Sequence, residues 1–286
     1  MIAETARSAW ASELPLAEFI FGGTHGMQQV RATLEAAAQD DLPLLIEGES
    51  GTGKEVLARY LHLRSRRAVG PFVRVNCEAL PARQLGGELF GNKMGATSIT
   101  EPRSTNCPAS LAEGGTLFLN GIVEMDLDLQ QKVVQMLKNG RSDLTDRNSH
   151  SPRIVCATSI DVQTAISQAR ALDSLASHFG HRVRLLPLRE RKQDIPQLCQ
   201  YLLDKLARSF GRPVPRLSPY VLESFKLLDW PGNIRELENW VARIVIFGSE
   251  DTTGLAFRRR PEVKESVQHR AVRGNQSRMR RARRHG

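Results

Sequence analysis

Short apolar runs alternate with stretches of helical spacing along the first two thirds of the chain. The apolar runs predict buried strands, and they lie at residues 43–47, 72–75, 116–119, 153–157 and 182–186. Residues 53–63 and 127–137 lie between such runs and carry apolar positions at helical spacing. Strands that alternate with helices indicate a parallel sheet with crossover helices, so an α/β fold is expected.

The strand pattern stops after residue 194, and the rest of the ordered chain is predicted to be helical. Residues 195–210, 220–228 and 234–247 have helical spacing, and a turn is expected at residues 230–233. We therefore expect an N-terminal extension over 1–15, an α/β core over 16–190 and a small helical lid over 191–248. Residues 249–286 show no apolar period and are expected to be a basic disordered tail.

The positive charge of the chain is confined to this tail. The chain has 40 Lys and Arg against 31 Asp and Glu, and eleven of the bases but only two of the acids fall in residues 258–286. The remaining chain holds 29 of each, so its charge gives no argument for a nucleic-acid surface on the folded part. The tail either contacts DNA phosphates non-specifically or is only a solvated charge run. Its Arg-rich composition also resembles out-of-frame translation of a GC-rich gene, a hypothesis that reading the other frames after codon 248 tests.

Several classes of protein are disfavoured by composition. No run approaches the roughly 18 apolar residues of a membrane span, and the N-terminus lacks the pattern of a signal peptide. The cysteines at 77, 107, 156 and 199 form no CxxC pair, which argues against a zinc site or a disulfide framework. A cytoplasmic protein without membrane contact is expected.

A glycine-rich loop, GESGTGKE at residues 48–55, follows a predicted strand and opens a predicted helix. That context is the one in which such a loop binds phosphate: backbone N–H groups and the helix N-terminus face the phosphate oxygens, and the lysine adds a full charge. The alternative is a glycine-rich turn without a ligand. The predicted nucleotide-binding residues of the loop are Gly48, Glu49, Ser50, Gly51, Thr52, Gly53, Lys54, Glu55 and Val56.

The loop and five further blocks together resemble the AAA+ domain of bacterial sigma-54-dependent transcription activators, the enhancer-binding proteins. The blocks are GPFVRVNCEALP at 70–81, GELFG at 87–91, GGTLFL at 114–119, LRERKQDIP at 188–196 and WPGNIRELEN at 230–239. The resemblance covers roughly residues 20 to 247. It implies an AAA+ P-loop ATPase fold, with a parallel sheet between helices and a helical lid, that binds ATP or ADP with Mg²⁺. It also implies oligomers of related AAA+ subunits acting on sigma-54 RNA polymerase.

The resemblance assigns roles to matching positions outside the loop. Ile20, Phe21 and Gly22 match the segment that contacts adenine. Asn76 matches the asparagine that positions the catalytic glutamate, and Arg235 matches the lid arginine that reaches the phosphates.

The chain departs from the family at the Walker B motif. Where the family ends this strand with Leu-Asp-Glu, the chain has Leu119, Asn120 and Gly121. An amide at 120 is a weaker ligand for Mg²⁺ than a carboxylate, so only a weak metal position is expected there. Gly121 has no side chain with which to polarise water, so hydrolysis is expected at least about a hundredfold below that of a normal member.

Four further family features differ. The GAFTGA loop that contacts the sigma factor corresponds to Gly95, Ala96, Thr97, Ser98, Ile99 and Thr100. Loss of its aromatic anchor predicts impaired sigma-54 contact. Only Arg170 can match one of the two arginine fingers, and Ser159 replaces the asparagine of the sensor segment. The family usually carries a helix-turn-helix after the lid, and none is expected in residues 249–286.

Three interpretations remain open. In the first, the chain is a degenerate sigma-54-activator-like regulator that binds nucleotide and hydrolyses it weakly or not at all. In the second it is an active ATPase that remodels sigma-54 RNA polymerase, with Asn120, Ser159 and Arg170 sufficient for turnover. In the third it is a truncated, non-functional copy.

Overall fold

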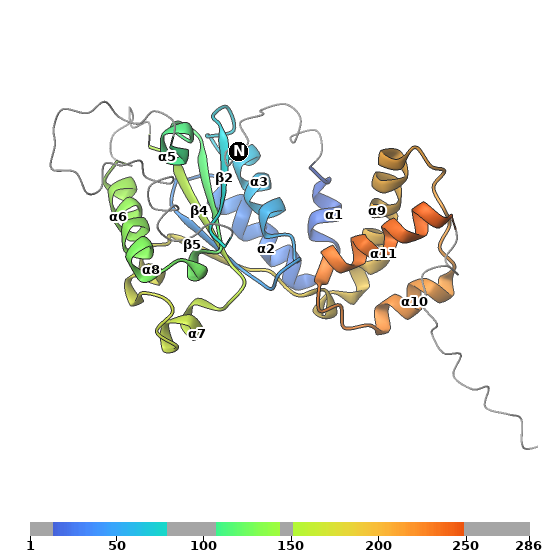
Figure 1. The fold of residues 1–286 in the computed structure, drawn as a ribbon. Coiled ribbons are helices and arrows are strands. Elements are labelled where there is room, and N and C mark those ends of the chain that lie inside the picture. Colours follow the sequence, from blue (N-terminus) through green and yellow to red (C-terminus); the bar gives the residue numbers. More distant parts are fainter. Residues whose placement is uncertain (1–13, 79–106, 144–150, 249–286) are drawn as a thin grey trace, which may run out of the picture.

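Five parallel strands form one sheet in the order β2-β3-β4-β1-β5 in the computed structural model, which describes residues 14–78, 107–143 and 151–248 (Figure 1). The strands are β1 (Leu44–Glu47), β2 (Phe72–Asn76), β3 (Thr116–Asn120), β4 (Arg153–Thr158) and β5 (His181–Arg184). All residues of β1 and β4 are buried. A parallel sheet covered on both faces requires such continuous apolar strands, and the predicted α/β fold is confirmed.

Helices cover both faces of this sheet (Figure 1). Side chains on one face join a core with α1 (Ala17–Phe21), α2 (His25–Ala37) and α3 (Lys54–Arg64). The other face packs against α5 (Pro108–Leu111), α6 (Leu127–Asp143), α7 (Val162–Ser167) and α8 (Asp173–Ser177). Neighbouring residues of a strand alternate between the two cores, as Phe118 and Leu119 do in β3, because successive side chains point to opposite faces.

A separate helical cluster follows the sheet. Two short 3-10 turns, η3 (Leu188–Glu190) and η4 (Lys192–Asp194), lead into α9 (Ile195–Phe210), α10 (Pro219–Leu227) and α11 (Asn233–Phe247). These helices enclose their own core around Phe225, Trp230 and Leu237. Phe19 of α1 stacks on Tyr201 of α9 with ring centroids 5.0 Å apart, so α1 lies between the sheet and the helical cluster (Figure 1).

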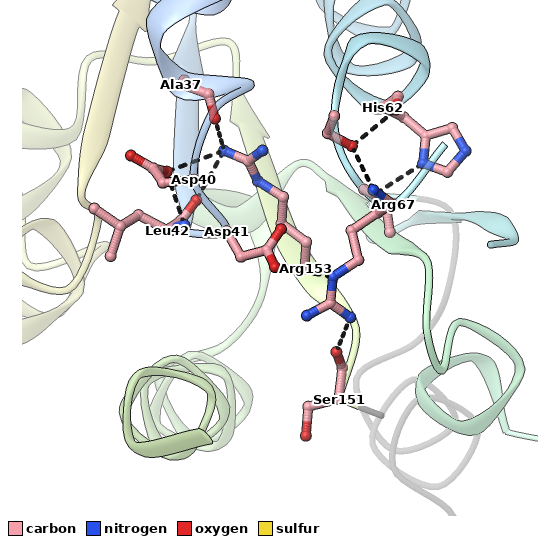
Figure 2. Close-up of polar contacts among 10 residues, drawn as sticks. Ala37, Asp40, Asp41, Leu42, His62, Arg67, Ser151 and Arg153 are labelled. Carbon is pink, nitrogen blue, oxygen red and sulfur yellow. Dashed lines mark hydrogen bonds and ion pairs between the residues drawn. The ribbon is translucent and has the colours of Figure 1, made fainter. Parts of the chain in front are cut away.

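A buried arginine forms hydrogen bonds with backbone groups at the amino-terminal edge of the sheet (Figure 2). Arg153 begins β4, its side chain is fully buried, and its Nη2 donates to the carbonyl oxygens of Ala37 at 2.8 Å and Leu42 at 3.0 Å. Burial lowers the pKa of the Arg153 guanidinium, and the carboxylates of Asp40 and Asp41 oppose that shift. These bonds fix the turn that leads from α2 into β1, on the edge opposite the phosphate-loop sequence.

The predicted elements recur with shifted ends, and several helices were not predicted. The helix predicted at residues 127–137 extends to Asp143, and the last strand begins one residue earlier and ends two residues earlier than expected. Helices α1, α2, α5, α7 and α8 had no counterpart in the sequence prediction. The predicted basic tail and most of the predicted N-terminal extension lie outside the described residues, and the proposed domain boundaries stay a prediction.

Candidate nucleotide site

The glycine-rich loop joins β1 to α3 at the carboxyl edge of the sheet. Gly51 and Gly53 adopt the left-handed region with φ of 78° and 99°, which glycine reaches without steric cost. The ammonium of Lys54 donates to the carbonyl oxygens of Gly48 at 2.6 Å and Glu49 at 3.0 Å. The lysine is thereby held inside the curve of the loop, at the N-terminus of α3, where a phosphate group is favoured.

The electrostatic setting of Lys54 suits an anion. Burial is the main influence on this lysine and lowers its pKa, because desolvation disfavours the charged form. The nearby carboxylates of Glu78 and Glu124 oppose the shift, whereas Arg235 adds to it. The loop geometry around this partly buried ammonium fits the phosphates of a nucleotide.

The other loop residues have structural contacts of their own. Thr52 is buried and its hydroxyl donates to the Glu49 carbonyl at 2.8 Å. Glu55 pairs with Arg59 at 2.7 Å and with Arg74 at 3.2 Å, so its carboxylate is engaged with two arginines. Val56 packs at the edge of the core shared with α2.

The amino end of α11 rests directly on the loop. The backbone N–H groups of Ile234 and Arg235 donate to the Gly51 carbonyl at 3.0 and 3.3 Å. The exposed Arg235 also donates from Nη1 to the Ser50 hydroxyl at 3.2 Å. A Cβ atom at Gly51 would lie 2.2 Å from the Gly232 carbonyl oxygen, so this contact requires glycine. The structure thus places the predicted lid arginine beside the phosphate loop.

A polar clasp between the loop and the lid was missed by the sequence analysis. Glu49 accepts two bonds from the Arg189 guanidinium, at 2.8 and 2.5 Å, and one from the Asn233 amide at 3.2 Å. Asn233 is fully buried, donates to the Ser50 carbonyl at 3.0 Å and accepts from the Leu188 N–H at 2.8 Å. These bonds lower the pKa of Glu49, chiefly through Arg189. Arg189 lies in the LRERKQDIP block and Asn233 in the WPGNIRELEN block, and these two blocks were the only sign in the sequence of the contact with the loop.

The altered Walker B residues end β3, beside the end of β2. Asn120 pairs in register with Asn76, and its side-chain amide donates to the Asn76 side-chain oxygen at 3.2 Å. Gly121 has a left-handed φ of 85°, and its N–H donates to the Ala157 carbonyl of β4 at 2.9 Å. The backbone is therefore in a conformation that side-chain-bearing residues rarely adopt.

The sensor position, Ser159, follows β4 and contacts a glutamate. Its hydroxyl donates to Glu124 Oε1 at 3.0 Å, and Glu124 ends the 3-10 turn η2 (Ile122–Glu124). The other oxygen of Glu124 is buried and lacks a hydrogen-bond partner within the described ranges. Asn76 and Asn120 end β2 and β3, and Ser159 directly follows the neighbouring β4, at the edge that carries Lys54. In open parallel sheets, ligands bind outside this carboxyl edge.

The predicted adenine segment is largely inaccessible from its apolar side. Phe21 is fully buried against Tyr60 with ring centroids 5.0 Å apart, and Ile20 is nearly buried. The Ile20 carbonyl accepts from the buried Arg191 at 3.2 Å. Gly22 lies against the Asp194 carboxylate, which would contact any side chain placed there.

The remaining predicted positions are distant or undescribed. Arg170 is exposed after α7, and its backbone carbonyl accepts from the side-chain amide of Gln130 at 2.8 Å. The predicted sigma-factor loop at 95–100 lies outside the described residues. Within the described residues no three His, Cys, Asp or Glu side chains form a metal site, and no helix is long and apolar enough for a membrane span.

A five-stranded parallel sheet, a phosphate loop at its carboxyl edge and a helical lid on that loop define an AAA+ P-loop protein. A family model described as the sigma-54 interaction domain matches residues 20–182, and one described as the AAA+ ATPase lid domain matches residues 189–270. The chain belongs to the sigma-54-dependent transcription activators.

Individual relatives agree with this assignment. The chain is 36% identical over 257 residues to the regulatory protein LuxO of Vibrio vulnificus, covering 86% of the chain and 56% of LuxO. It is 39% identical over 238 residues to the transcriptional regulator NtrC of Rhizobium meliloti, covering 81% and 48%. The crystal structure of NtrX from Brucella abortus in complex with ATP has 28% identity and a TM-score of 0.69, over 86% of this chain and 56% of NtrX. The chain spans about half the length of these relatives.

Proposed function

We propose that this domain binds ATP or ADP and hydrolyses ATP weakly or not at all, acting as a regulatory subunit among related AAA+ proteins in the cytoplasm. The observation that carries the proposal is the contrast between two parts of one site. The phosphate loop is complete, with Lys54 held inside it and Arg235 beside it. The end of β3 lacks both acidic groups that phosphoryl transfer uses to hold metal and orient water.

The binding half of the proposal rests on the loop and its neighbours. Lys54, the left-handed glycines and the N-terminus of α3 form a concave set of donors, and NtrX is a relative solved in complex with ATP. Lid residues Arg189 and Asn233 fix Glu49, so the loop is held in shape before any ligand arrives. Preorganisation of this kind reduces the entropy lost on binding.

The proposal of weak hydrolysis rests on the residues at the positions that would hold Mg²⁺ and orient the attacking water. Asn120 offers only a neutral amide oxygen to Mg²⁺, and its nitrogen is directed at Asn76. Glu55, next to the lysine, is engaged with Arg59 and Arg74. A hard cation prefers charged oxygen ligands, so Mg²⁺ would be held mainly by the nucleotide phosphates.

The partner assignments follow from sequence positions that differ from the family. Sigma-54 contact is expected to be impaired because Thr97 stands where the loop carries an aromatic residue. Arg170, exposed on the surface, is the one candidate for an arginine that reaches a neighbouring subunit. DNA contact would come only non-specifically, from the basic residues beyond 248.

Titration calorimetry with ATP tests the binding claim. Wild-type protein should bind ATP, and Lys54→Ala should weaken binding at least about tenfold by removing a charge-assisted contact. Lys226→Ala is the matched control because Lys226 pairs with Glu223 on the lid surface. Absence of ATP binding at millimolar concentration, or equal loss in both variants, would overturn the proposal.

A further inference from the structure

A glutamate from the neighbouring strand end occupies the space beside Gly121. Glu78 follows β2 by two residues, and Gly121 follows β3, which pairs with β2 in parallel. A Cβ atom on Gly121 would lie 2.7 Å from Cγ of Glu78 and 3.2 Å from its Oε1. The Glu78 side chain therefore fills the volume in which a side chain at 121 would begin.

The carboxylate of Glu78 also acts electrostatically on the phosphate-binding lysine. Among the charges that act on Lys54, Glu78 is the strongest of those that favour its protonated form, followed by Glu124. The geometry at Gly121 and this charge coupling agree in placing the Glu78 carboxylate at the end of the sheet that carries Lys54.

Glu78 is better suited to act on a ligand than Glu124. Glu124 is half-buried and accepts the Ser159 hydroxyl at 3.0 Å. Glu78 is exposed, and its carboxylate has no hydrogen-bond partner within the part of the chain that the structure describes. An exposed carboxylate without a partner among the described residues can turn toward water.

We propose that Glu78 supplies the water-orienting carboxylate that Gly121 lacks, so that the residual ATP turnover of this domain depends on Glu78. The inference rests on the proposed function. The Glu78 carboxylate accepts a hydrogen bond from a water molecule placed at the γ-phosphate of bound ATP. The water oxygen forms a bond to the γ-phosphorus, and the bond to the β–γ bridging oxygen breaks.

The step is balanced without any further reagent. ADP leaves with the electron pair of the broken bond, and the released proton passes through the carboxylate to solvent. Lys54 stabilises the charge that develops on the phosphate oxygens. Positioning a carboxylate in this way contributes about 100- to 10,000-fold to such proton transfers, although a side chain from another strand is expected to reach only part of that range.

Glu78→Gln tests the proposal, with Glu113→Gln as the matched control. Glu113 is an exposed glutamate that precedes β3, at the opposite edge of the sheet. Turnover above the Lys54→Ala background should fall at least about tenfold in Glu78→Gln and stay unchanged in Glu113→Gln. ATP affinity of Glu78→Gln should be unchanged or tighter, because a negative charge near the phosphates is lost. A merely structural role would weaken binding as well.

A second variant probes position rather than charge. The new Cβ of Gly121→Ala would lie 2.7 Å from Cγ of Glu78 and 3.3 Å from Oε2 of Glu124, so it should displace chiefly Glu78 and lower turnover while both glutamates are retained. Gly114→Ala is its control, because Gly114 has a similar φ of 70° but open space around its Cβ position.

Each failure has a distinct meaning. Turnover that is unchanged in Glu78→Gln overturns the inference. Wild-type turnover no higher than that of Lys54→Ala also overturns it. Neither result contradicts the proposal that the domain binds nucleotide. Loss of turnover in Glu124→Gln but not in Glu78→Gln assigns the role to Glu124 and also overturns it. Absence of ATP binding contradicts the proposed function itself.

Discussion

The side-chain amide of Asn120 donates to the side-chain oxygen of Asn76 at 3.2 Å, across the paired ends of β3 and β2. Two neutral amides thus meet at the strand ends, and one of them, Asn120, stands where the resemblance places an acidic residue. The site retains its anion-binding groups and has lost acidic ones.

Asn120→Asp should restore metal-dependent binding. A carboxylate at 120 is a stronger Mg²⁺ ligand than the amide, and Asn76 can donate its own amide N–H to it. We expect ATP binding in the presence of Mg²⁺ to tighten by about tenfold, with little change when Mg²⁺ is chelated. Titrations with and without the metal measure the difference. Equal affinities in both conditions would show that residue 120 does not face the metal.

Gly121→Glu should be destabilising rather than restorative on its own. The φ of 85° at this position costs a side-chain-bearing residue about 1–2 kcal/mol, and the new Cβ approaches Glu78. Urea unfolding should show a loss of that size, and the double variant Gly121→Glu with Glu78→Ala should recover the part that comes from the steric contact. An unchanged or increased free energy of unfolding in the single variant would contradict the backbone argument.

The buried member of the lid clasp should matter more than the exposed one. Asn233→Ala leaves the Leu188 N–H and the Ser50 carbonyl without partners and should cost about 1–3 kcal/mol in unfolding free energy. Arg189→Ala removes a surface ion pair with Glu49, whose side chains are about 40% exposed, and should cost less than about 1 kcal/mol.

Lys205→Ala is the control for the clasp, since it removes an exposed ion pair with Glu238 within the lid itself. Urea unfolding of the three variants measures the order. A larger loss in Arg189→Ala than in Asn233→Ala would show that the ion pair, not the buried amide, holds the lid on the loop.

Lys54 should make the stability of nucleotide-free protein rise with alkaline pH. Burial lowers its pKa in the folded state below the 10.5 of the free side chain. Between the two values the unfolded chain binds more protons, so the free energy of unfolding increases as pH rises through that window. In Lys54→Met this increase in the free energy of unfolding with pH should disappear, whereas in Lys226→Met it should remain. Unfolding measured across this range checks the sign, and a fall of stability specific to Lys54 would contradict it.

The sequence predicted the parts of this molecule that local pattern controls. The apolar runs of the sheet, the loop around Lys54 and the three lid helices all lie where their spacing indicated. Helix α2 was missed although Met27, Val30, Leu34 and Ala37 are buried at helical spacing, a signal present in the sequence. Contacts between distant segments had no local signature.

Two such contacts changed the picture of the site. Arg189 and Asn233 approach Glu49 only because the lid folds back onto the loop, more than a hundred residues away along the chain. Glu78 matters because β2 and β3 are neighbours in the sheet, and because Gly121 takes a left-handed conformation that pattern analysis does not report. From the sequence alone, Gly121 was only a position without the side chain that would polarise water.

The central claim is that the domain holds ATP firmly and cleaves it slowly, and phosphate release at saturating ATP tests it most directly. The purified chain is assayed at an ATP concentration at which calorimetry shows the site to be filled, with Lys54→Ala as the background. Typical enzymes turn over about 1–1000 times per second, and the account predicts at least about a hundredfold less than the median of about 10 per second. A filled site with turnover in the ordinary range would contradict it.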